Sequence, residues 1–233
     1  MDNKVQLFVA GVIHQDPLGR PQVQRWLREL LLRERRPPTF VAVEWDKDDL
    51  ARIVSQRPKL AELAKAQWPN ATTEFIDALA DAAGYEGDSH ATILPSVETV
   101  WLDEGREPDA EEIERFTEFR MVKYKALAAG LEKFDLEGLK YMSAAAWNSV
   151  LPRVEGTTPR DEKFATRLYT AFGINTSNWA IAILGADHTA DSPGSAIDLL
   201  IHNGISCNVT NMAPDNISAK QSVHLTGNPS ISK

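Results

Sequence analysis

The chain has very little cysteine. Its 233 residues include one cysteine, Cys207, so no disulfide can form within the chain. Sparse cysteine is usual in proteins of reducing compartments. The chain also lacks any apolar run with the length and flanks of a signal peptide or a membrane span. We therefore expect a cytoplasmic protein without a membrane partner.

An excess of basic charge is lacking as well. The chain has 25 Lys and Arg against 33 Asp and Glu, a formal net charge of −8. A nucleic-acid partner requires a basic face that meets phosphate groups, so this balance argues against one. We interpret the arginine-rich stretch 25–36 as the solvated face of a helix.

Three motifs with known chemistry are missing from the sequence. It has no Gly-x-Ser-x-Gly elbow, no glycine-rich loop for phosphate and no cysteine-rich metal motif. Cys207 has no pattern of histidine or acidic residues around it, so we expect a buried, inert thiol. Chemistry must therefore come from other side chains.

Apolar strands alternate with amphipathic helices along the chain. Hydrophobic residues make up 43% of it and charged residues 25%, as in a globular domain large enough for a sizeable core. This alternation predicts an α/β fold with a mainly parallel central sheet flanked by helices. The expected strands are 5–10, 39–44, 97–102, 180–184 and a short one near residue 207; the main expected helices are 21–36, 47–54, 58–67, 71–83, 109–131, 136–147, 159–172 and 193–202.

The composition changes near Thr210. Beyond it Asn, Ser, Thr and Pro are frequent and large apolar residues are few. We expect a single α/β domain over residues 1–209 and a flexible tail over 210–233.

Two segments of the sequence repeat one pattern. An apolar run leads into Gly11-Val12-Ile13-His14, and another leads into Gly185-Ala186-Asp187-His188. Glycine allows a sharp turn at the end of a buried strand, which puts the histidine at the mouth of the sheet. The echo predicts two pseudo-repeated halves, each with a strand-Gly-x-x-His unit, and one site shared by His14 and His188.

A third candidate follows the second strand. Ligands bind outside the carboxyl ends of the strands in open parallel sheets, and Glu44 ends the run Phe40 to Val43 there. A charge in such an apolar setting must be paired. One alternative is a buried ion pair between Glu44 and an arginine; another makes both histidines ordinary structural residues.

Two histidines and a carboxylate are a common set for a divalent metal. Imidazole and carboxylate suit Mn, Co or Zn, and an open coordination position can hold an activated water. His14, Glu44 and His188 are the expected ligands, with Glu44 alternatively the base. His90 joins them if a helix from residue 71 persists, because Glu86 and His90 are then spaced i and i+4; otherwise both face solvent at a helix end.

Two arginines are candidate catalytic residues. Arg120 interrupts the apolar stripe of the helix 109–131, so we expect it to snorkel, to pair with Glu44 or to bind a substrate carboxylate. Thr158-Pro159-Arg160-Asp161 is typical of a helix start, with Thr158 as N-cap and Asp161 reaching back to it. Arg160 has no evident structural task there. Either arginine is suited to stabilise a developing oxyanion.

These motifs together resemble the TraB/PrgY/GumN/Tiki group, and more distantly the ChaN and erythromycin-esterase families. The resemblance rests on Gly11 to His14, on Glu44, on Gly185 to His188 and on Arg160-Asp161, and it spans about residues 5–202. It implies an α/β fold of two related halves around a polar site. Tiki-like members are described as Mn- or Co-dependent proteases, erythromycin esterases hydrolyse without an obligatory metal, and ChaN-like proteins bind haem.

We expect a hydrolase that cleaves an amide or ester bond of a peptide or small molecule, with a divalent metal. The alternatives are an esterase-like hydrolase that needs no metal and a non-catalytic protein that binds haem or a peptide. Asp187 stands before the second histidine, where it either joins the site or caps the next helix. The sequence leaves the oligomeric state open, with a homodimer among the options.

Overall fold

The computed structural model describes residues 5–14, 16–82, 88–103, 110–149, 156–174, 179–190, 192–214 and 223–225. Six strands of this part form one sheet, in the order β3-β2-β4-β1-β5-β6. Neighbouring strands are parallel from β3 to β5, and β6 is antiparallel to β5. The predicted fold class, α/β with a mainly parallel sheet, is confirmed. The strands are β1 (Gln6–Val12), β2 (Phe40–Val43), β3 (Glu98–Trp101), β4 (Trp179–Gly185), β5 (Ser206–Asn211) and β6 (Val223–Leu225).

The two strand-Gly-x-x-His units lie side by side. β1 and β4 pair in parallel from Gln6 opposite Trp179 to Val12 opposite Gly185. β2 pairs with the other edge of β4. Both central strands are almost wholly buried, as expected where helices cover the two faces of a parallel sheet. The segments that follow β1, β2 and β4 therefore all start at the same end of the sheet, where these parallel strands finish. This end is called the carboxyl edge below.

Helices alternate with these strands, and several begin with a side-chain cap. Thr72 accepts the Phe75 N–H at the start of α4, and Ser195 accepts the Asp198 N–H at the start of α9. The helices are α1 (Gly19–Glu34), α2 (Lys47–Ser55), α3 (Arg57–Gln67), α4 (Thr73–Asp81), α5 (Ala110–Leu127), α6 (Leu136–Asn148), α7 (Pro159–Ile174), α8 (Ala186–Thr189) and α9 (Ala196–His202).

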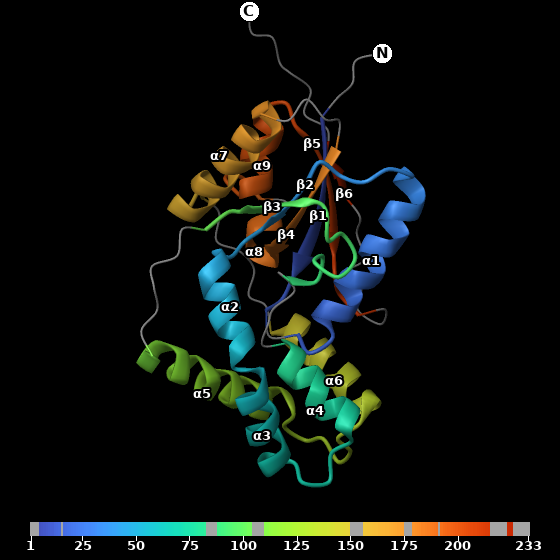
Figure 1. Ribbon diagram of the computed structural model, residues 1–233, viewed down its shortest axis with the longest axis vertical. Helices are drawn as coiled ribbons and strands as arrows, with labels where there is room; N and C mark the ends of the chain where they lie inside the picture. Colours follow the sequence, from blue (N-terminus) through green and yellow to red (C-terminus); the bar gives the residue numbers. More distant parts are fainter. Residues whose placement is uncertain are drawn as a thin grey trace, which may run out of the picture.

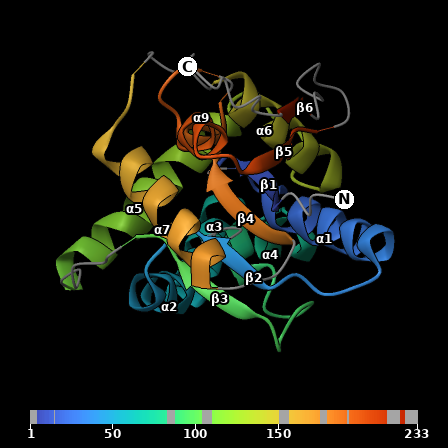
Figure 2. The ribbon, with the colours of Figure 1, turned by 90° about the horizontal axis from the view of Figure 1, so that it is seen from above.

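Helices cover both faces of the sheet (Figures 1 and 2). On one face Phe164 and Leu168 of α7 and Leu200 of α9 pack against alternate residues of the strands. On the other face Val23 and Leu27 of α1 do the same. Alternation of side chains along each strand divides the core into these two layers.

A group of helices forms a further layer with its own core. Side chains of α3, α4, α5 and α6 pack together there, among them Leu60, Phe75, Tyr124 and Leu139. Figure 1 shows this group beyond the lower end of the sheet, where β1 and β4 finish. The carboxyl edge of the sheet thus faces a helical layer.

The structure adds detail to several expectations. The short helix α8 and the strand β6 are not among the predicted elements. β5 continues to Asn211, past the boundary placed at 209, and β6 lies within the predicted tail 210–233; the remainder of that tail, 215–222 and 226–233, lies outside the described residues. Cys207 is buried, and burial raises the pKa of its thiol to about 12, as expected of an inert cysteine. None of the helices in the described ranges is long and apolar enough to cross a membrane.

Candidate active site

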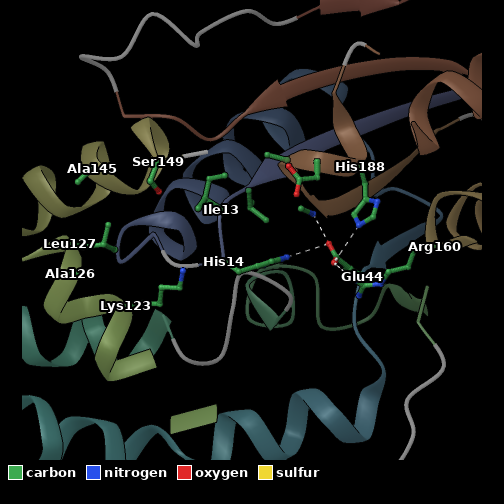
Figure 3. Close-up of a pocket in the computed structure, with 14 residues that line it drawn as sticks. Ile13, His14, Glu44, Lys123, Ala126, Leu127, Ala145, Ser149, Arg160 and His188 are labelled. Atoms are coloured by element: carbon green, nitrogen blue, oxygen red, sulfur yellow. Dashed lines mark hydrogen bonds and ion pairs between the residues drawn. The ribbon is translucent and has the colours of Figure 1, made fainter. Parts of the chain in front are cut away.

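A pocket of about 670 Å³ opens at the carboxyl edge of the sheet. The ends of β1, β2 and β4 supply its polar wall, and helices α5 and α6 supply the opposite wall (Figure 3). Four of the predicted site residues meet here: His14, Glu44, Arg160 and His188. The lining is completed by Val12, Ile13, Lys123, Ala126, Leu127, Ala145, Ser149, Gly185, Ala186 and Asp187.

Glu44 lies at the centre of the polar wall and is 3% exposed. Its Oε2 accepts the backbone N–H of Gly185 at 2.6 Å and lies 3.4 Å from His14 Nε2. Its Oε1 lies 3.1 Å from Arg160 Nη1 and 3.8 Å from His188 Nε2. One carboxylate therefore links both Gly-x-x-His units and an arginine, as the dashed lines of Figure 3 trace.

These neighbours keep Glu44 ionised. Burial alone raises the pKa of this carboxyl, but His14, through charge and a hydrogen bond, and the charges of His188 and Arg160 outweigh it and lower the pKa to about 2. An anion so well stabilised is a weak base at neutral pH. Glu44 is thus suited to hold positive partners in place.

Gly185 is required by the close approach of these groups. A Cβ at this position would lie 3.0 Å from Glu44 Oε2 and 3.1 Å from His14 Nε2. The glycine that ends β4 therefore makes room for the carboxylate and donates its own N–H to it. The sequence predicts a glycine here because the chain turns sharply. The structure adds a second reason, because the missing side chain leaves space for Glu44.

His188 is oriented by Asp161. Its Nδ1 lies 2.9 Å from Asp161 Oδ1, so the ring donates Nδ1–H to the carboxylate and presents Nε2 toward Glu44 and the pocket. Asp161 is fully buried, and its Oδ2 accepts the N–H and the hydroxyl of Thr158. Asp161 therefore forms the predicted helix cap. It also accepts a hydrogen bond from His188, a role that the capping pattern in the sequence does not indicate.

Arg160 bridges two carboxylates. Its Nη1 lies 3.1 Å from Glu44 Oε1, and its Nε and Nη2 donate to Asp103 Oδ2 at 3.1 and 2.7 Å. Lys163 donates to the other oxygen of Asp103, and these two cations lower the pKa of Asp103 against the opposing effect of burial. Glu44 does form an ion pair with an arginine, Arg160, in which the carboxylate is buried and the guanidinium side chain is 41% exposed.

Arg120 has a different place from the one predicted. It is 2% exposed and donates from Nη1 to the backbone carbonyl of His14, and it is not among the residues that line the pocket. It neither pairs with Glu44 nor points a free guanidinium at a substrate. Arg120 lies on the buried face of α5, next to the segment that follows β1. Its hydrogen bond there holds the backbone of His14 in place.

His90 also lies apart from the pocket lining. α4 ends at Asp81 and His90 lies in a turn, while residues 83–87, Glu86 among them, lie outside the described residues. His90 is 4% exposed, and its Nε2 lies 2.8 Å from Thr99 Oγ1. Asp187 lines the pocket from the first turn of the short helix α8.

The donor types of the site suit a metal, and the contacts that Glu44 already makes would compete with one. Both oxygens of Glu44 already face hydrogen donors, from Gly185 and Arg160, and the guanidinium lies where a second cation would be repelled. Within the described ranges no three or more His, Cys, Asp or Glu side chains form a group that could hold a metal ion. His188 donates its Nδ1–H to Asp161, as metal-binding histidines commonly donate their second ring nitrogen to a carboxylate. The same hydrogen bond also orients a histidine that acts as a base.

Comparison with known proteins gives little to add to this geometry. No family model and no curated protein matches the sequence. A solved structure described as the structure of the type III effector HopBA1 aligns over 78% of this chain and 67% of that chain, with 12% identity and a TM-score of 0.31. A likeness at that level carries no argument about fold or function, so the site is interpreted from its own residues.

Proposed function

We propose that this protein is a hydrolase that cleaves an ester or amide bond at the site formed by His14, Glu44, Arg160 and His188. The observation that carries the proposal is the buried Asp161 bonded to His188 Nδ1, which leaves Nε2 directed at a pocket. The kinship with the TraB/Tiki group is proposed on the two Gly-x-x-His units and Glu44.

His188 acts as the general base in this proposal. With Nδ1–H donated to Asp161, the free electron pair lies on Nε2, which removes a proton from a water in the pocket. The hydroxide attacks the carbonyl carbon of the ester or amide. The proton then passes from Nε2 to the leaving alcohol or amine as the carbon–oxygen or carbon–nitrogen bond breaks.

Arg160 stabilises the oxyanion of the tetrahedral intermediate. A guanidinium carries five N–H donors, and the contacts of Arg160 to Glu44 and Asp103 occupy three of them in the described structure. The two remaining donors are available to a substrate oxygen. Glu44 and Asp103 hold the guanidinium rigid, which removes the need to reorganise it during the reaction.

A divalent metal would be held by His14, Glu44 and His188, and it would supply a bound water of lowered pKa. The contacts of Glu44 with Gly185 and Arg160 support the version in which His188 activates water without a metal.

The test is hydrolysis of a panel of 4-nitrophenyl esters and aryl amides by the wild type and by His188→Asn. Loss of a general base costs about 100-fold or more in rate, so we expect kcat/KM of the variant to fall at least that far. His202→Asn is the matched control, since His202 is an exposed histidine at the end of α9, outside the pocket.

Two outcomes contradict the proposal. One is that the folded wild type hydrolyses none of the panel. The other is that His188→Asn and His202→Asn retain equal activity, which would place the measured hydrolysis outside this site.

A further inference from the structure

The two walls of the pocket differ in chemistry. The sheet side carries His14, Glu44, Arg160 and His188, as described above. The helical side carries the apolar Ala126 and Leu127 of α5 and Ala145 of α6, the hydroxyl of Ser149 at the C-cap of α6, and one cation among the lining residues, Lys123. Figure 3 shows Lys123 on the side of the pocket opposite Glu44 and Arg160, with His14 between them.

The position of Lys123 follows from the geometry of α5. Residues three and four apart lie on one face of a helix, so Lys123, Ala126 and Leu127 share a face, and Arg120 lies one turn before Lys123 on it. Arg120 bonds to the carbonyl of His14 and so fixes this face against the site. The next turn therefore carries Lys123 to the pocket.

Lys123 differs in its partners from Lys59, Lys140 and Lys163. Lys59, Lys140 and Lys163 lie 2.6 to 3.1 Å from a carboxylate oxygen. Lys123 contacts the ring of Phe119, with Nζ 5.2 Å from the ring centroid, and no carboxylate of the described ranges lies within ion-pair distance of it. Its charge is available to a ligand.

Arg160 cannot serve a distant anion in the same way. Its guanidinium already lies against Glu44 and Asp103 on the sheet side. Among the described residues, a substrate anion on the helical side thus meets the cation of Lys123 beside a short apolar surface. The net charge of −8 makes such a local cation more selective, since the rest of the molecule repels anions.

We propose that Lys123 binds a carboxylate of the substrate, which is an ester or amide whose carboxylate is separated from the scissile bond by a short apolar chain. The chain lies along Leu127 and Ala145 while the bond to be cleaved lies at His188. This inference rests on the proposed hydrolase for the reaction, and on the lining of the pocket for the binding of the carboxylate.

Calorimetric titration with hexanoate and with hexanamide tests the carboxylate site without turnover. The two probes share a chain length and differ in charge. We expect the wild type to bind hexanoate more tightly by up to about 5-fold, as for an exposed ion pair. Lys123→Met should bring this ratio close to one.

Lys125→Met is the matched control. Lys125 is an exposed lysine of α5, and two residues along a helix turn it by about 200°, away from the pocket lining. It should keep the preference for hexanoate. Circular dichroism of both variants checks that the helix is intact.

Three results overturn the carboxylate site: no measurable binding of hexanoate by the wild type, equal binding of both probes by the wild type, or an unchanged preference in Lys123→Met. The proposed hydrolase fails separately, through the esters and amides tested on His188→Asn. If the protein prefers hexanoate but hydrolyses none of the esters or amides, the carboxylate site is supported and the proposed hydrolase is contradicted.

Discussion

At the scale of single residues, Glu44 decides how the site is built. It is a buried carboxylate with a backbone donor, two histidines and an arginine around it. A buried charge is tolerated when partners replace the water it loses, and removal of one member of such a group costs about 3–5 kcal/mol. The site is therefore coupled to the stability of the fold through this side chain.

The pH dependence of stability should report the ionised Glu44. Its pKa of about 2 in the folded protein lies below the 4.5 of the free side chain, so its contribution is present above pH 4.5 and disappears as the pH falls toward 2. The shift corresponds to about 3 kcal/mol. Urea unfolding at pH 6 and pH 3 should show that Glu44→Gln loses less stability on acidification than the wild type.

Glu118→Gln serves as the control for this comparison, because Glu118 is an exposed residue of α5. Its loss of stability on acidification should match that of the wild type. Equal losses in the wild type and in Glu44→Gln would show that the Glu44 carboxylate does not stabilise the fold.

The sequence was informative for some residues and silent for others. His14, Glu44 and His188 were predictable because each follows an apolar strand, and parallel strands bring such ends to one edge. Asp161 was missed as a partner of His188 because its capping of α7 already explained it. Arg120 was misplaced because helical spacing gives the buried face of α5 but not the group that this face meets.

At the scale of secondary-structure elements, the ends of strands carry the site. β4 lies between β1 and β2, so the residue that ends β4 is next to the groups that follow its two neighbours. Gly185 occupies this position, and its N–H is part of the site. The geometry of the site therefore depends on the backbone of one strand end as much as on side chains.

Gly185→Ala should disturb both stability and hydrolysis. The added Cβ would press on Glu44 and His14 at 3.0 and 3.1 Å, and overpacking of this kind costs about 1–3 kcal/mol. Thermal unfolding and the ester assay measure the two effects. Gly173→Ala in α7 is the control, since its Cβ meets open space and alanine favours the helix by up to about 1 kcal/mol.

A Gly185→Ala variant with the stability and activity of the wild type would contradict the tight packing assigned to this strand end. Unchanged stability with reduced hydrolysis would instead place the strain on the orientation of the carboxylate.

The existence of most elements followed from periodicity, whereas their lengths did not. The strands predicted at 5–10 and 180–184 appear as Gln6–Val12 and Trp179–Gly185. α4 ends at Asp81, two residues before the predicted end at 83, and residues 83–87 lie outside the described ranges. α8 and β6 are too short for a pattern of period 3.6 or 2 to stand out from the surrounding residues.

At the scale of the whole molecule, the pocket forms where two layers meet. The carboxyl edge of the sheet supplies the polar wall, and α5 and α6 supply the apolar wall with Lys123. The amphipathic pattern of these helices predicts that one side is buried, but not that the helical layer stands over the edge of the sheet. For that reason Lys123 could not be recognised from the sequence, while the histidines could.

The most direct test of the account is hydrolysis by protein from which metal ions have been removed with a chelator and verified by elemental analysis. The proposed base, Asp161-oriented His188, belongs to the chain itself, so the metal-depleted wild type should retain kcat/KM within about 2-fold on the best ester of the panel. Loss of that activity on depletion, with recovery on addition of Mn, Co or Zn, would contradict the proposed mechanism and assign the site to a metal.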